Sequence, residues 1–186
     1  MPQRPNASEE RLMKIMGIDA SSTATGWSVF DGNNLIGYGI IKPNGSDWRD
    51  RLVHQGPYLA QVIQKYKPDK IYMEDVPLKK GNAKALVILG AVQGFIYGIT
   101  ASFEIPVEFL LPSEWRSPLG LYDGTREGTK RAELKHKSIL KANEIFGLNL
   151  QWLSPSSKKN EDDISDAILI AYSQIKKKRF GRPKSQ

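Results

Sequence analysis

Acidic residues at three widely separated places in the chain have the chemistry needed to bind divalent cations. Asp19 follows an apolar segment, Glu74 and Asp75 follow another, and a third group occupies residues 162–166. Carboxylates that come close together repel one another, so a fold gains little stability from gathering them. Carboxylate oxygens are, however, preferred ligands of Mg²⁺, and paired metal ions promote phosphodiester cleavage. The three groups therefore indicate metal-dependent chemistry on phosphates.

Each acidic residue also has a structural interpretation when it is taken alone. Asp19 suits a turn at a strand end, and Asp162 suits the N-cap of a helix. Glu74 would be satisfied by a salt bridge with Lys79 or Lys80. Asp75 is expected to face the opposite side of its strand from Glu74.

Asp163 and Asp166 are less easily explained as capping residues. They are three apart and lie roughly 60° apart around a helix axis, on one face. Asp166 is about a full turn inside the expected helix, beyond the reach of a simple cap. Together with Asp19 and Glu74 they make four carboxylates that we expect to converge on two metal ions.

The elements that would position these residues follow from hydrophobic periodicity. Helix 48–66 contains Pro57, which is expected to kink or interrupt it. An initial three-stranded meander followed by strand–helix units predicts an α/β domain, with a mixed five-stranded sheet and helices on its faces. Asp19 and Glu74 then fall at strand ends, where sites in such sheets gather. The strands are expected at 14–19, 26–30, 35–41, 70–74 and 107–110, and the helices at 48–66, 82–103, 130–146 and 162–176.

Length and composition favour one soluble domain in residues 13–176, with a flexible leader at 1–12 and a flexible basic tail at 177–186. The chain has 186 residues, of which 40% are hydrophobic and 25% charged. It contains no cysteine, which excludes disulfides and thiol nucleophiles. The apolar region 83–101 is interrupted by lysine, glutamine and glycines, so no membrane span is predicted. A cytoplasmic location is the default expectation.

The net charge of +7 is concentrated in local patches. Six basic residues lie in the C-terminal segment 176–184, and the rest of the chain has 21 basic against 20 acidic residues. A second basic stretch covers residues 126–141. Two such stretches beside a carboxylate site favour a phosphate backbone as partner.

Three segments together resemble a known family. Residues 16–27 (MGIDASSTATGW) resemble the first catalytic motif of RuvC-type Holliday-junction resolvases, 72–76 (YMEDV) the second, and 163–167 (DISDA) the third. The resemblance covers about residues 13–176. The segment 111–116 (LPSEWR) and the basic helix after it are similar to bacteriophage members.

The resemblance implies an RNase H-like fold with helices on both faces of the sheet, and a homodimer acting on branched DNA such as a four-way junction. It also implies two Mg²⁺ ions per site, with Mn²⁺ as a substitute. Their ligands would be Asp19, Glu74, Asp163 and Asp166, with Asp19 shared by both ions. The protein would act in the cytoplasm, that of the bacterial host if it is phage-encoded.

The chain departs from this family's pattern after the second motif. Bacterial members have an aromatic wedge there, whereas residues 77–80 are Pro-Leu-Lys-Lys. A wedge inserted into the junction is therefore not expected. The expected phosphate contacts are instead Lys79, Lys80, Arg116, Lys130, Arg131 and Lys135.

Other functions remain open at this stage. One is an RNA-processing nuclease of the related YqgF type, and another is a catalytically inert junction-binding protein. An actin-like nucleotide-binding protein ranks last, because the chain is too short for two lobes. For the third motif, either of the two residues that directly precede it, Glu161 or Asp162, is an alternative ligand to Asp163.

Overall fold

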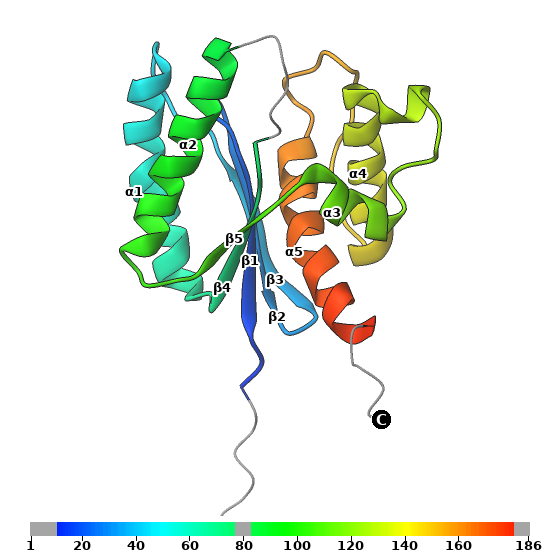
Figure 1. Cartoon of the computed structure of the whole chain (residues 1–186), viewed down its shortest axis with the longest axis horizontal. Helices are drawn as coiled ribbons and strands as arrows, with labels where there is room; N and C mark the ends of the chain where they lie inside the picture. The colour runs from blue at the N-terminus through cyan, green and yellow to red at the C-terminus, as the bar shows by residue number, and fades with distance from the viewer. Residues whose placement is uncertain (1–10, 77–82, 181–186) are drawn as a thin grey trace, which may run out of the picture.

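The computed structural model describes residues 11–76 and 83–180, which form one sheet flanked by helices (Figure 1). The strands are β1 Lys14–Ala20, β2 Thr25–Asp31, β3 Asn34–Ile41, β4 Lys70–Glu74 and β5 Val107–Leu110. The α-helices are α1 Trp48–Tyr66, α2 Ala83–Ala101, α3 Pro112–Arg116, α4 Arg131–Phe146 and α5 Asp162–Phe180. Two short 3₁₀ helices, η1 Ser117–Leu119 and η2 Glu127–Thr129, lie between α3 and α4.

The sheet is mixed, as the sequence pattern predicts. Its strand order is β3-β2-β1-β4-β5. The strands β1, β2 and β3 are antiparallel neighbours, whereas β1, β4 and β5 run parallel. The central strands β1 and β4 therefore end at the same edge of the sheet, and each ends at or next to one of the predicted acidic residues.

Helices cover both faces of the sheet, with α1 and α2 on one side and α3, α4 and α5 on the other (Figure 1). Alternate side chains of β1 enter two separate cores. Met16 packs in the core under α1 and α2, whereas Ile15 packs in the core under α4 and α5. This two-sided burial explains why β1 is almost continuously apolar.

Helix α5 lies unusually close to the sheet. A Cβ atom on Gly17 would collide with the backbone carbonyl of Ala167, and one on Gly26 with that of Asp163. The Ser28 hydroxyl donates a 2.9 Å hydrogen bond to the Ala167 carbonyl oxygen. Because Gly17 in β1 and Gly26 in β2 have no side chains, the first turns of α5 can approach the end of β1.

Helices α1 and α5 differ from the sequence-based expectation in ways that concern Pro57 and the C-terminal end. Helix α1 continues through Pro57, so the predicted interruption is wrong. Pro57 lies on the exposed side, and the carbonyl that it frees belongs to the exposed Val53, where water can satisfy it. Helix α5 continues to Phe180, beyond the predicted end at residue 176.

Helix α2 carries a largely exposed apolar surface. Only Val92, Ile96 and Thr100 are fully buried in it. By length and composition alone, α2 is the one helix in residues 11–76 and 83–180 that is long and apolar enough to cross a membrane. Its buried residues pack in the core beneath α1, which favours a surface helix of the domain whose outer face is apolar.

Candidate active site

The four predicted carboxylates come from three elements that meet at one edge of the sheet. Asp19 is the penultimate residue of β1 and Glu74 the last of β4, while Asp163 and Asp166 lie in the first two turns of α5. A cavity of about 70 Å³ at this edge is lined by Asp19 and Glu74, with Leu89 and Gln93 from α2. Asp163 and Asp166 are not among the residues that line this cavity, so convergence of all four carboxylates on one metal site stays a prediction.

Arg116 joins the carboxylate of the sheet to that of the helix. Its Nη1 lies 3.2 Å from Oε2 of Glu74, and its Nη2 lies 3.1 Å from Oδ2 of Asp166. The side chains of Arg116 and Asp166 are only 12% and 5% exposed. Ion pairs at this depth are weakly screened by solvent, so the guanidinium holds β4 and α5 together at the site.

Two further residues fix Glu74, and sequence reasoning assigned a role to neither. The indole Nε1 of the fully buried Trp115 donates a 2.8 Å hydrogen bond to Glu74 Oε2. The side-chain amide of Gln93 donates a 2.9 Å hydrogen bond to the Glu74 backbone carbonyl. A buried tryptophan usually needs a partner for its N–H, which was the available signal for Trp115.

Lys135 pairs with the acidic start of α5. Its ammonium contacts the Asp162 carboxylate and lies 3.7 Å from Oδ1 of Asp163. Asp162 was expected to be a helix cap, and in the structure its side chain is instead a buried partner of Lys135. Asp163 keeps a more open position, with 26% of its side chain exposed.

Asp75 borders the same cavity, although it was expected to face away from Glu74. Its Oδ1 accepts a 2.8 Å hydrogen bond from the Val76 amide. That local bond gives one oxygen of the carboxylate a partner within its own turn. The structural role of Asp75 stays a prediction, whereas its expected separation from the cavity is wrong.

The protein environment disfavours negative charge at this site. Burial raises the pKa of Asp19 well above its usual range, and the charges of Asp166, Asp163 and Glu74 raise it further. Burial likewise raises the pKa values of Glu74 and Asp166, and the positive charge of Arg116 partly offsets both shifts. A site that accumulates more carboxylates than its surroundings favour is suited to receive a cation.

The donor set fits a hard divalent cation, although the side chains are not arranged as a closed metal site. No three Asp, Glu or His side chains among the described residues are close enough to ligate one ion. The buried Oδ1 of Asp166 has no partner with good hydrogen-bond geometry in the described part of the chain, although the Ser138 hydroxyl is near enough to lower the pKa of Asp166. Such an atom is costly unless a ligand completes it.

Comparisons with known proteins identify the family. The model of the family "Crossover junction endodeoxyribonuclease RuvC" matches residues 15–174. The chain belongs to this family. A relative from Nitratidesulfovibrio vulgaris, named crossover junction endodeoxyribonuclease RuvC, is 28% identical over 172 residues, covering 90% of this chain and 93% of the relative. A Rhizobium etli relative of the same name is 26% identical over 167 residues, covering 87% and 89%.

Solved structures confirm the RNase H-like fold of the RuvC family. Thermus thermophilus RuvC in complex with a Holliday junction substrate has a TM-score of 0.67 and 18% identity, and covers 91% of this chain and 97% of that chain. The yeast mitochondrial Holliday junction resolvase Ydc2 has a TM-score of 0.54 and 12% identity, and covers 89% and 78%. The predicted fold and the predicted junction-resolving endonuclease activity are thus confirmed at the level of the family.

The predicted phosphate contacts of this RuvC-family chain fall into three groups. Lys79 and Lys80 lie outside the described residues. Arg116 and Lys135 face the carboxylates, as described above. Lys130 is 63% exposed and pairs with Glu127, and Arg131 is close enough to Glu74 to lower its pKa.

Proposed function

We propose that this RuvC-family protein is a Mg²⁺-dependent endonuclease that nicks Holliday junctions and other branched DNA in the cytoplasm. The observation that carries the proposal is the convergence of carboxylates from β1, β4 and α5 at one sheet edge. Asp166 adds a buried carboxylate oxygen without a partner of good hydrogen-bond geometry in the described chain. That combination is what a metal-dependent phosphodiesterase needs.

Asp19, Glu74, Asp163 and Asp166 would hold two Mg²⁺ ions, with Mn²⁺ as a substitute. When bound, such ions lower the pKa of an attacking water and stabilise the leaving oxygen. The chain's own contribution is positional. Trp115 and Gln93 fix Glu74, while the contact of α5 with Gly17 and Gly26 fixes Asp163 and Asp166 relative to β1.

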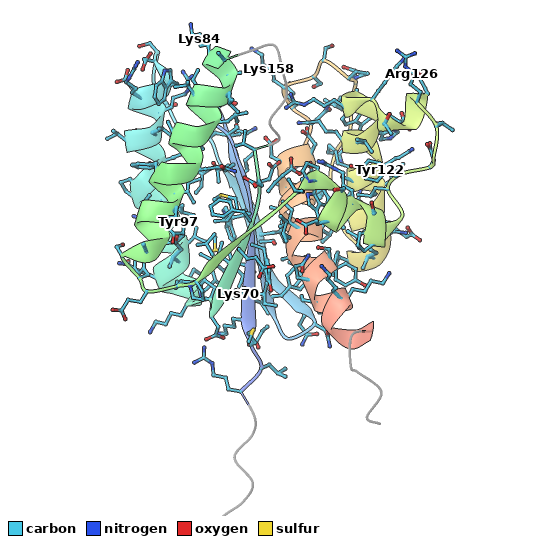
Figure 2. All side chains as sticks on the ribbon, in the orientation of Figure 1. Lys70, Lys84, Tyr97, Tyr122, Arg126 and Lys158 are labelled. Carbon is cyan, nitrogen blue, oxygen red and sulfur yellow. The ribbon has the colours of Figure 1, made fainter. Side chains whose placement is uncertain are left out.

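Basic residues surround the same edge of the domain. Lys84, Arg126 and Lys158 lie at the end of the molecule where α2 and α5 begin, as Figure 2 shows. All three are exposed. Together with Lys130 and Arg131, they would contact the phosphate backbones of the junction arms, and their number predicts a strong salt dependence of binding.

The exposed face of α2 supports a homodimer. Val87 and Tyr97 are 65% and 50% exposed on this face. Between and beside them, Gly90, Gly94 and Gly98 recur every fourth residue, and a Cβ on any of them would meet open space. A glycine stripe flanked by apolar side chains allows two copies of one helix to pack closely. We therefore infer that a second copy of this chain packs against the exposed face of α2.

The resemblance of residues 111–116 to bacteriophage members supports a phage-type protein. In the structure this segment forms α3, which delivers Trp115 and Arg116 to Glu74. We propose that this segment is part of the active site and that its sequence reflects the way this chain supports its carboxylates.

The proposed function is tested with a labelled four-way junction and two variants. Asp166→Asn keeps the shape of the side chain but removes the charge, so nicking in Mg²⁺ should fall to background while junction binding is retained or tightened. Asp123→Asn is the matched control, because that carboxylate pairs with Lys137 outside the site. Wild-type protein that binds the junction but produces no nicks in Mg²⁺ or Mn²⁺ would refute the proposal.

Structured RNA of similar length provides the second arm of this experiment. The proposal expects paired, symmetric nicks in the DNA junction and no cleavage of the RNA. Preferential cleavage of the RNA would instead support the RNA-processing alternative. Equal background cleavage by the wild type and by Asp166→Asn would support an inert junction-binding protein.

A further inference from the structure

Arg116 pairs with the same two carboxylates, Glu74 and Asp166, that are proposed to bind metal. Each of its two terminal nitrogens contacts one carboxylate oxygen, at 3.2 Å and 3.1 Å. Mg²⁺ binds oxygen ligands at about 2.1 Å and requires near-ideal octahedral geometry. A Mg²⁺ ion bound by both carboxylates would lie close to a guanidinium held by the same two groups, so the two cations would repel each other and compete for the same negative charge.

Arg116 is held by several contacts, but one of its guanidinium nitrogens has no hydrogen-bond partner among the described residues. Its guanidinium carbon lies 4.1 Å from the centre of the Trp115 ring, a cation–π contact that supports the side chain from one side. The nitrogen without a partner in this part of the chain is the buried Nε. The contacts that hold Arg116 are thus mainly its two ion pairs and the ring, and a metal bound by the two carboxylates would weaken both ion pairs.

We propose that Arg116 is a built-in counter-ion that holds Glu74 and Asp166 together before metal binds and leaves at least one of them when Mg²⁺ arrives. The inference rests on the proposed metal-dependent function. It makes Arg116 a positioning residue that also sets the affinity for metal. Release from the carboxylates would free the guanidinium for the phosphate contact predicted from the sequence.

Two substitutions separate this role from a purely structural one. Arg116→Gln removes the charge, so in EDTA the melting temperature should fall, because two buried carboxylates lose their partner. The same variant should bind Mg²⁺ about tenfold more tightly, because no ion pairs have to be broken first. Arg116→Lys keeps the charge but cannot bridge two carboxylates as a planar fork, so its Mg²⁺ affinity should be intermediate.

The control is Lys70→Gln. Lys70 makes a 2.6 Å salt bridge with Glu108 between β4 and β5, at the end of β4 opposite to Glu74. Lys70→Gln removes this pair and lowers the net charge by the same amount as Arg116→Gln. It should leave the Mg²⁺ affinity unchanged. Mg²⁺ affinity is measured by calorimetric titration of the full chain without DNA, and thermal unfolding is followed with EDTA and with Mg²⁺.

The direction of the affinity change decides the outcome. Tighter binding in Arg116→Gln with unchanged binding in Lys70→Gln supports the counter-ion role. Unchanged or weaker Mg²⁺ binding in Arg116→Gln overturns it, and Arg116→Lys decides if the glutamine variant does not fold. A wild-type protein without nicking activity whose Arg116→Gln variant binds Mg²⁺ more tightly would refute the proposed function and leave this inference standing.

Discussion

The indole Nε1 of Trp115 and the carboxylate of Glu74 are joined by a 2.8 Å hydrogen bond at the centre of the site. The accepting Oε2 is also the oxygen that Arg116 contacts. One short helix, α3, therefore controls both the orientation and the charge of a predicted metal ligand. Supporting contacts of this kind commonly matter almost as much as the ligands themselves.

We expect Trp115→Phe to lower junction nicking by about 10- to 100-fold, because the ring is kept but the donor to Glu74 is lost. Nicking rates at saturating DNA, measured over a range of Mg²⁺ concentrations, test this expectation. Weaker Mg²⁺ binding by the same variant, measured by calorimetry, would show that the defect lies in the metal ligand Glu74. Circular dichroism checks that the fold is kept.

Trp152→Phe is the matched control for this prediction. Trp152 is partly buried and stacks on His136, with ring centroids 5.1 Å apart. Its substitution therefore perturbs packing without touching Glu74. Equal losses of nicking in Trp115→Phe and Trp152→Phe would mean that the hydrogen bond to Glu74 has no special importance.

Much of the fold follows from local sequence patterns. The bounds predicted for α1 and β4 agree with the structure, because apolar periodicity and flanking turns mark both elements clearly. Helix α3 was missed and expected to be loop, since it has only five residues and begins with Pro112. The strand order was also not predicted, because pairing between distant strands leaves no local signal.

The carboxylates of the site were easier to predict than their partners. Asp19 and Glu74 follow apolar strands, so their position at a sheet edge is a consequence of topology. The bridge from Arg116 to both Glu74 and Asp166 depends on how α3 is placed against α5. That placement depends in turn on tertiary packing, such as the close approach of α5 to Gly26, which periodicity does not reveal.

The exposed face of α2 gives a prediction about assembly. Val87→Glu would place a charge on the exposed apolar face of α2, where a second copy would have to bury it unpaired. We expect this variant to be monomeric at concentrations at which the wild type is a dimer, as measured by analytical ultracentrifugation. It should also lose paired nicking of opposite junction strands while retaining single nicks.

Val53→Glu is the control for assembly. Val53 is 71% exposed on α1 and is thus as accessible as Val87, but it does not belong to the glycine-containing face of α2. It should remain dimeric. A dimeric Val87→Glu variant would place the interface elsewhere on the molecule, and monomers in both variants would point to a general charge effect.

The raised pKa of Asp19 predicts how the metal-free protein responds to pH. Burial and the charges of Asp166, Asp163 and Glu74 make protonated Asp19 favoured in the folded state. Between its ordinary pKa and the raised value, the folded chain therefore binds more protons than the unfolded chain, so stability falls as pH increases. Asp19→Asn removes this penalty, and its gain in melting temperature in EDTA should be greater at pH 8 than at pH 5.

Asp47→Asn provides the control because the shift at Asp47 has the opposite sign. A hydrogen bond from the Arg49 backbone lowers the pKa of Asp47, so its contribution to stability is lost only below its ordinary pKa. The effect of Asp47→Asn should therefore be the same at pH 5 and pH 8.

Adding Mg²⁺ at pH 8 should stabilise the wild type more than Asp19→Asn, because the metal compensates the charge that the variant lacks. A gain for Asp19→Asn that does not depend on pH would show that relief of local packing, rather than charge, stabilises the variant.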